Sequence, residues 1–265
     1  MSMLPTYVLA WRTSAEALLG MAPHLTDAEW ATPTDCPGWT VQDIYAHSAH
    51  LEAELCAAKE TPAEIDNRQQ MPQEHTEAGV DARRGRPADE VVAELAARVE
   101  ERGARLDPLP EDPDAPAPMT SAGLRWSWDT LLRNRSIDMW MHEQDVRRAA
   151  GKPGGLDSPG AMVTINSLAF TLPYVLGKKV GAPAGTIVRW NVTGEVPLNV
   201  KLVVGGDGRA HRTDEPVEPS VTLAMSSETF AILMAGRQAP HEVEVTVSGD
   251  DRLGQQVLAA MTVTP

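Results

Sequence analysis

Two ionisable side chains share one face of a helix expected at residues 127–150. Asp138 and His142 are four residues apart, a spacing that places both on the same side of an α-helix. That side belongs to the apolar stripe of the helix, so both side chains are expected to point into a protein interior. A carboxylate in such a place needs an opposite charge or a metal ion, because burying an isolated charge is costly. A structural ion pair between Asp138 and Arg135 is the competing interpretation.

A histidine on an earlier helix offers a third ligand. The helix expected at residues 40–59 begins with Thr-Val-Gln-Asp, the pattern of a capping box. His47 flanks the apolar stripe of this helix, whereas His50 points nearly opposite the stripe and is expected to be solvated. A lone flanking histidine is more often structural than a ligand. Together with Asp138 and His142, however, His47 would complete a three-ligand site with open positions, as catalytic zinc requires.

The elements that position these residues are predominantly helical up to about residue 180. Apolar residues recur there with helical spacing. Five helices are expected, at residues 7–19, 40–59, 87–106, 127–150 and 159–176. A proline-rich loop at residues 107–119 separates the third from the fourth, and Pro173 is expected to end or kink the fifth.

The pattern changes after Gly185. Apolar and polar residues alternate in three segments, which indicates half-buried strands. The alternating residues are Val188, Trp190 and Val192, then Val200, Leu202 and Val204, and most cleanly Val243, Val245 and Val247. Short helices are expected at residues 226–236 and 250–261. The pattern therefore predicts an α+β fold overall, with a helical domain at residues 1–180 followed by a small α+β domain at residues 186–265.

Composition excludes several classes of partner. The formal net charge of −14 argues against nucleic acid or an anionic membrane, because both need a basic face. The N-terminal segment lacks the basic region of a secretory signal, and no uninterrupted apolar run approaches membrane-spanning length. Only two cysteines are present, Cys36 and Cys56, and neither belongs to a C-x-x-C pair. We therefore expect a cytoplasmic protein with reduced thiols.

Two stretches of the sequence carry a family resemblance. The stretch at residues 34–55 contains Gly-Trp-Thr at a helix start and then His47, and the stretch at residues 138–155 contains Asp138, Trp, His142 and Asp145. Their order and spacing resemble the mycothiol-dependent maleylpyruvate isomerase family, which is related to the DinB-like metal-binding bundles. The resemblance implies that the helical domain at residues 1–180 is a DinB-like four-helix bundle. Residues 221–240 and 243–261 are similar to the sterol-carrier-like domain that often follows this bundle.

The resemblance implies a ligand set and a cosubstrate. It identifies His47, Asp138 and His142 as ligands of a divalent metal, and zinc is the expected metal. The family more often has Glu where this chain has Asp138, which is shorter by one methylene. The cosubstrate would be mycothiol, the low-molecular-weight thiol of actinobacteria. Arg237, just after Gly236 at an expected helix end, is a candidate catalytic residue that would bind an anionic group; a solvated surface arginine is the alternative.

Several functions remain open on this evidence. We favour a mycothiol-dependent thiol S-transferase that acts on a small electrophile. The alternatives are a maleylpyruvate-type cis–trans isomerase, a metal-dependent hydrolase in which bound water is the nucleophile, and a noncatalytic metal- and ligand-binding protein. The expected partners are the thiol and the electrophile, and the chain is expected to be a monomer or a homodimer. The residues that bind the thiol are not identified by the sequence.

Overall fold

The computed structural model describes residues 2–264. The chain divides after Val163 into two compact units, which we describe separately. Helix α7 (Pro159–Ala169) spans the division. The domain ranges expected from the sequence, 1–180 and 186–265, stay a prediction.

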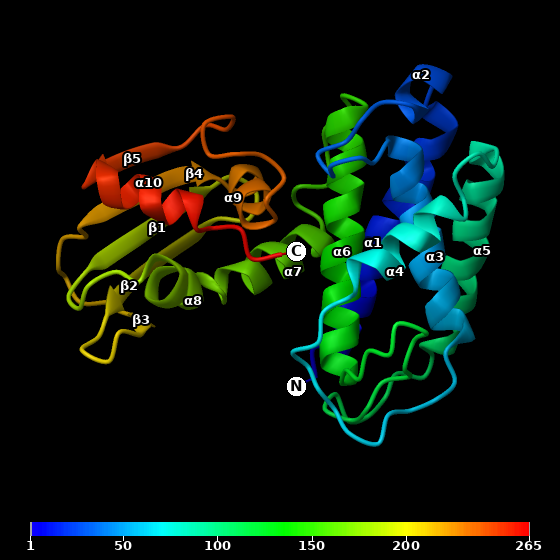
Figure 1. The fold of residues 1–265 in the computed structure, drawn as a ribbon, viewed down its shortest axis with the longest axis horizontal. Coiled ribbons are helices and arrows are strands. Elements are labelled where there is room, and N and C mark those ends of the chain that lie inside the picture. Colours follow the sequence, from blue (N-terminus) through cyan, green and yellow to red (C-terminus); the bar gives the residue numbers. More distant parts are fainter. Residues whose placement is uncertain (1, 265) are drawn as a thin grey trace. The chain divides into compact units, whose positions relative to one another are not determined.

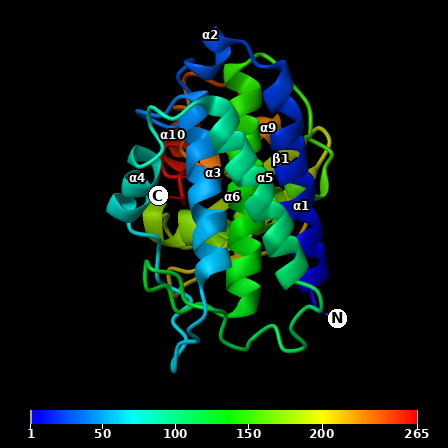
Figure 2. The same ribbon diagram turned by 90° about the vertical axis from the view of Figure 1, so that its right-hand side faces the viewer.

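The first unit is built on four long helices. They are α1 (Leu4–Met21), α3 (Val41–Ala57), α5 (Ala88–Arg105) and α6 (Trp128–Ala149). Figure 2 shows them side by side, and each packs on two of the others: α1 on α5 and α6, and α3 on α5 and α6. The arrangement is a four-helix bundle, as predicted.

The bundle is stabilised by apolar side chains on the facing sides of these helices. On α5, Val91, Leu95 and Val99 recur every four residues and are buried, which is the spacing of a single helix face. Trp11 and Tyr45 are among the large side chains that fill the centre with almost no exposure. Since most helical stability in proteins comes from such packing, these residues determine where the polar side chains of the same helices lie.

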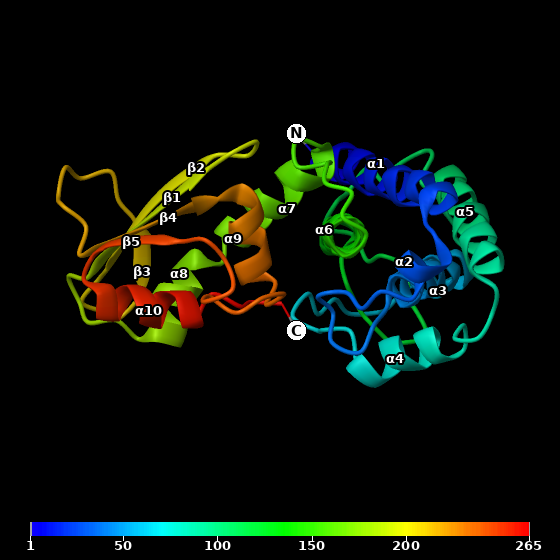
Figure 3. The same cartoon turned by 90° about the horizontal axis from the view of Figure 1, so that it is seen from above.

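Shorter helices connect the long ones. They are η1 (Ala22–His24), α2 (Asp27–Trp30) and α4 (Gln73–Asp81). Helix α4 packs on α3, on the outside of the bundle (Figure 3). Only Gly79 and Val80 of α4 are buried, so its sequence has little apolar periodicity and did not predict a helix.

The second unit contains a five-stranded sheet within the described residues. The strands are β1 (Ile187–Thr193), β2 (Leu198–Val204), β3 (Ala210–Arg212), β4 (Val221–Ser226) and β5 (Thr246–Gly249). Their order across the sheet is β3-β2-β1-β4-β5. The pair β1–β4 is parallel and the other pairs are antiparallel. The alternating burial along β1 and β4 shows that one face of the sheet is covered more completely than the other.

Helices complete this unit. They are α8 (Leu172–Tyr174), the π-helical segment η2 (Val175–Val180), α9 (Ser227–Met234) and α10 (Asp251–Ala259). Figure 3 shows α8 and α10 on the same side of the sheet, and α10 also packs on η2. The predicted fold class, a helical bundle followed by a smaller α+β region, is confirmed. The sterol-carrier-like character of that region stays a prediction.

Two expected elements differ from the structure. The alternating valines predict a strand from residue 243, but β5 begins at Thr246, which pairs with Ala224 of β4. In the same antiparallel register Val243 would lie opposite Ser227, which already belongs to α9. The fifth helix ends at Ala169, before Pro173 is reached. Pro173 instead lies in the first turn of α8, where proline is tolerated.

One helical stretch of the described residues passes a length and composition test for crossing a membrane. It covers Pro159–Val180, and 56% of its most apolar window is buried. The core helix of a soluble protein passes the same test, so this stretch is weak evidence for a membrane span. The stretch consists of three successive elements, α7, α8 and η2, rather than one continuous α-helix. Figure 1 shows α7 and α8 in succession along it.

Candidate metal centre

Helix α3 positions His47. Gly38, with φ of 81°, forms the turn before the helix, and Thr40 caps its first turn. The Thr40 side chain accepts a hydrogen bond from the Asp43 backbone N–H, and the Asp43 carboxylate accepts one from the Thr40 backbone N–H at 2.9 Å. This capping box was predicted, and it sets the helical phase that places His47 inside the bundle with a side chain 5% exposed.

Helix α6 positions Asp138 and His142. Ser127 caps the helix by accepting a hydrogen bond from the Thr130 backbone N–H, and the apolar side chains of Met139 and Val146 are fully buried. These anchors turn the face that carries Asp138 and His142 towards α3. His142 is buried, whereas the carboxylate of Asp138 is 32% exposed.

The three side chains converge on one point. Nε2 of His47 and Nε2 of His142 each lie 3.5 Å from Oδ1 of Asp138. The ring centroids of the two histidines are 4.7 Å apart. Ligand atoms about 2.0–2.1 Å from a tetrahedral zinc are separated by roughly 3.3 Å, so the observed spacing needs little change to hold a cation. The side chain of Asp138 is partly exposed, so solvent reaches at least this member of the cluster.

A second layer of side chains orients His142. Its Nδ1 lies 3.0 Å from Oδ2 of Asp145, and Cys36 Sγ donates to the same oxygen at 3.2 Å. Arg148 donates to the other Asp145 oxygen at 2.6 Å and also binds Asp35. A carboxylate that accepts from Nδ1–H keeps the proton there and leaves Nε2 with a lone pair for a metal. His47 differs, since its Nδ1 is buried without a hydrogen-bond partner among the described residues.

A buried network of ions supports Asp138 from the other side. Arg135 donates to Oδ2 of Asp138 at 2.6 Å and to Glu52 at 2.7 Å. Arg102 also donates to Glu52, which accepts a further bond from the indole N–H of Trp11 at 2.9 Å. Glu52 is completely buried. The ion pair proposed as an alternative for Asp138 is therefore present, and it occupies the carboxylate oxygen that does not face the histidines.

The three donor side chains have different pKa shifts and therefore different charges at pH 7. Burial opposes ionisation of Asp138, but Arg135 and the two histidines outweigh it and hold the pKa of this carboxyl well below its usual range. Burial lowers the pKa of His47 to about 4, so this imidazole is neutral at pH 7. For His142 the carboxylates of Asp138 and Asp145 outweigh burial and raise its pKa well above the usual value. An anionic oxygen, a neutral imidazole and a protonated imidazole thus face the point of convergence, and a cation bound there would have to displace the proton from Nε2 of His142.

Trp39 covers the imidazoles. Its ring centroid lies 5.0 Å from that of His47 and 6.0 Å from that of His142. The indole N–H of Trp39 donates to Glu77 of α4 at 2.9 Å. The aromatic residue of the Gly-Trp-Thr motif therefore forms an apolar wall of the site and ties it to α4.

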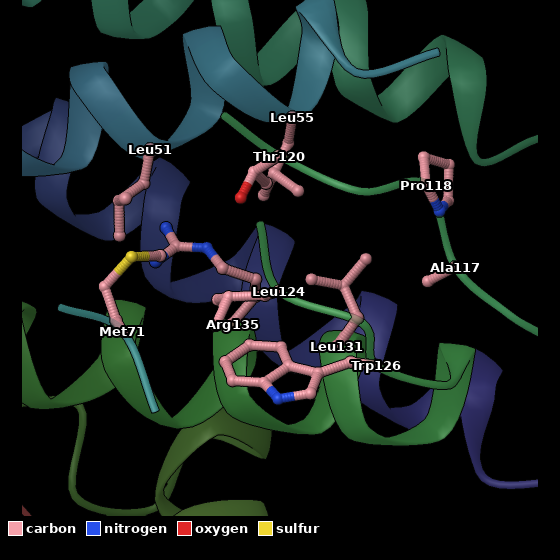
Figure 4. Close-up of a pocket in the computed structure, with 10 residues that line it drawn as sticks. All are labelled: Leu51, Leu55, Met71, Ala117, Pro118, Thr120, Leu124, Trp126, Leu131 and Arg135. Atoms are coloured by element: carbon pink, nitrogen blue, oxygen red, sulfur yellow. The ribbon is translucent and has the colours of Figure 1, made fainter. Parts of the chain in front are cut away.

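An apolar cavity lies along α6 beside Arg135 (Figure 4). Figure 4 shows the Arg135 guanidinium near Leu51 and Met71, with Trp126 below it. The enclosed volume is about 20 Å³, room for about one water molecule. This cavity is therefore a packing gap of the bundle and not a space for a substrate.

Comparison with known proteins places the first unit. The sequence profile described as "Mycothiol maleylpyruvate isomerase N-terminal domain" matches residues 11–147, more than half of the chain. The chain belongs to this family. That membership confirms the predicted family resemblance, and with it the expectation of an enzyme.

Solved structures agree with the assignment to the mycothiol maleylpyruvate isomerase family. A crystal structure of the mycothiol-dependent maleylpyruvate isomerase matches with a TM-score of 0.59 at 17% identity, covering 92% of each chain. A point mutant of that enzyme matches with a TM-score of 0.58 and the same coverage. At this identity the likeness establishes the fold. No curated protein sequence matches the chain significantly.

The predicted site residues of this family member are divided between the two units. His47, Asp138 and His142 lie together in the first unit. Arg237 lies in the second unit after α9, where its backbone N–H donates to Ile232 at 2.9 Å. The assignment of the three metal ligands and a catalytic role for Arg237 stay predictions. His50 was expected to be solvated, and that was wrong: its side chain is 15% exposed because α4 covers it.

Other site residues were missed by the sequence analysis. Glu52 lies on the same helix as His47, and Arg102 comes from α5. Their pairing depends on which helices are neighbours, a property that helical periodicity does not reveal. One signal was available, since a helix as apolar on one side as residues 40–59 rarely buries a glutamate without a cationic partner.

Proposed function

We propose that this chain is a metal-dependent enzyme that uses mycothiol as a cosubstrate and isomerises a small electrophile of the maleylpyruvate type. The observation that carries the proposal is the convergence of His47, Asp138 and His142 within residues 11–147, the segment that matches the isomerase family. Two imidazoles and one carboxylate are donors that suit zinc. The accessible edge of Asp138 leaves a coordination position that a thiol can take.

The residues of the site would hold the cation and tune it. A bound divalent cation stabilises the deprotonated form of a coordinated thiol, which is the nucleophilic form. Asp145 keeps the proton of His142 on Nδ1, and Arg135 keeps one oxygen of Asp138 turned away from the imidazoles. Trp39 shields the imidazoles from water. These contacts would preorganise the site before the thiol arrives.

Thiol S-transfer is the second candidate, and the sequence analysis preferred it. The family match lies on the unit that carries the metal cluster, so it supports thiol activation more directly than the choice of electrophile. A thiolate that adds reversibly to a double bond permits rotation about the resulting single bond before the thiol leaves. A thiolate that remains attached gives a transferase. Family membership favours the first outcome.

A noncatalytic protein with a structural metal finds less support. Structural zinc normally has four protein ligands. Among the described residues the cluster offers three donors that lie close to one another, and His50 belongs to a different group.

Arg237 is kept as a candidate for binding an anionic group of the substrate, and cytoplasmic localisation and zinc as the metal also belong to the proposal.

The test is a turnover assay that follows the thiol as well as the electrophile. The zinc-loaded chain is incubated with mycothiol and maleylpyruvate, and both are quantified by chromatography and mass spectrometry. Isomerisation converts the electrophile without net loss of thiol, whereas S-transfer consumes one thiol per turnover. Turnover at an unchanged rate without any thiol would overturn both and leave metal-assisted hydrolysis.

A further inference from the structure

A second group of metal-ligating side chains lies between α3 and α4. His50 and Glu54 are one turn apart on α3, and His75 comes from the first turn of α4. One donor atom from each residue lies within 4.8 Å of the other two. Nε2 of His75 is 2.8 Å from Oε2 of Glu54, and Nε2 of His50 is 4.0 Å from Oε1 of the same carboxylate. Each oxygen therefore faces one imidazole.

The group is incomplete as a hydrogen-bond network. The contact between His75 and Glu54 satisfies both partners, and Ser121 donates to Glu54 as well. Nε2 of His50, however, is buried and has no hydrogen-bond partner among the described residues. A buried polar atom without a partner is costly, so a simple network of hydrogen bonds does not account for the position of this ring.

The backbone of α4 is shaped around the same ring. A Cβ atom added at Gly79 would lie 2.0 Å from Cδ2 of His50, so only glycine permits the ring to pack there. Arg83 is the nearby cation, but it is paired with Glu94 at 2.6 Å. The net charge facing the group is thus the single negative charge of Glu54.

We propose that His50, Glu54 and His75 form a second binding site for a divalent transition-metal cation, distinct from the site on α6. Two imidazoles and one carboxylate again suit Zn²⁺. The cation would give Nε2 of His50 a binding partner, and it would link α4 to α3 because its ligands come from both helices. Glu77 of α4 accepts a hydrogen bond from Trp39, which packs on His47. The link between α4 and α3 would therefore also stabilise the position of Trp39.

Zinc binding to the full-length chain tests the proposal. The apoprotein is titrated with Zn²⁺ against a chromophoric chelator, for the wild type and three variants. We expect two equivalents for the wild type, one for His75→Ala and two for His24→Ala, which removes an exposed histidine and serves as the control. In His142→Ala, which disables the site on α6, the remaining equivalent should bind as in the wild type.

A milder variant and a direct observation keep the test decisive if His75→Ala folds poorly. Glu54→Gln retains the size of the side chain but removes its charge, and it should lower the affinity for the second Zn²⁺ at least tenfold. Loss of even a residue that only supports a ligand costs ~10–100-fold in metal affinity, so loss of a ligand charge should cost no less. Anomalous scattering at the zinc edge from wild-type crystals should show a peak between His50, Glu54 and His75. A single equivalent that His75→Ala retains and His142→Ala loses, or no peak at this position, would overturn the proposal.

Discussion

His47 and His50 lie three residues apart on α3 and have different surroundings. His47 faces α6, where Asp145, Arg135 and Trp39 hold the side chains of its cluster from several directions. His50 faces α4, a helix of nine residues with two buried positions. The donors of the two groups are alike, two imidazoles and one carboxylate. The difference is in the support around them, which is extensive for the first group and thin for the second.

This contrast suggests different tasks. A site that binds and activates a ligand needs donors whose positions do not depend on the metal, and the first group has such donors. A site whose second half comes from a short surface helix gains order when the metal binds, because binding free energy then becomes folding free energy. We expect the donors of the first group to hold their positions without metal, and the second group to become ordered, and to stabilise α4, only when it binds a metal.

The largest effect is expected when each group is disabled in turn. His142→Ala removes a donor of the first group and should abolish both metal binding there and turnover. His50→Ala leaves that group intact and should keep the metal on α6, with most of the activity. For each variant, mass spectrometry measures the metal content and an assay with mycothiol measures the turnover. Activity that survives His142→Ala but not His50→Ala would reverse the roles of the two groups.

The second largest effect is expected from the buried ions behind Asp138. Glu52→Gln leaves Arg102 and Arg135 without their shared carboxylate, and breaking a buried pair costs about 3–5 kcal/mol. Burial opposes the ionised form of Glu52, but the two arginines outweigh it and lower its pKa in the folded state. The carboxylate therefore contributes stability above its unfolded pKa of about 4.3, and that contribution is lost as the pH falls through the folded value.

Chemical denaturation at several pH values checks this prediction. The difference in unfolding free energy between the wild type and Glu52→Gln should be largest near pH 7 and should shrink below about pH 4. Glu100→Gln, an exposed position on α5, is the control and should change stability by no more than about 0.5 kcal/mol. A difference that is independent of pH would mean that the carboxylate charge is not what stabilises the network.

A smaller effect is expected when the orientation of His142 is disturbed. Asp145→Asn keeps the shape of the side chain but weakens its hold on the proton of Nδ1. Loss of such an outer partner lowers metal affinity by about 10–100-fold. Competition with a zinc chelator measures the change at the first site, and zinc affinity of the second should be unaltered. Equal loss at both sites would show that the variant disturbs the whole bundle and not one ligand.

The two groups also differ in how far the sequence predicts them. Asp138 and His142 share a helix of 22 residues with a clear apolar stripe, so helical periodicity alone brings them together. His50 also lies on a long helix with an apolar stripe, yet the prediction that its side chain is solvated was wrong. The reason is α4, whose packing on α3 arises from tertiary contacts that leave almost no periodic signal in residues 73–81.

The same limit applies to the fold. The capping box of α3 and the apolar stripes of the long helices are local features, and they predict these helices well. The start of β5 at Thr246 is set by its pairing with Ala224 of β4, which is a property of the two strands together. Likewise, Glu52 and Arg102 meet because α3 and α5 are adjacent, and nothing within either helix indicates that adjacency.

The smallest effect is expected from exchanging the carboxylates that distinguish the two groups. The first uses Asp138, whereas the second uses Glu54, which is longer by one methylene. Asp138→Glu should keep the metal and reduce affinity by no more than about tenfold, roughly 1.4 kcal/mol. The reason is that the side chain is 32% exposed, which gives the longer carboxylate room to bend outward while Arg135 follows it. Asp138→Ala, which removes the donor, should lose the metal under the same conditions. Zinc competition separates the variants, and a loss with Glu as complete as that with Ala would show that the helix spacing at this site admits only the shorter acid.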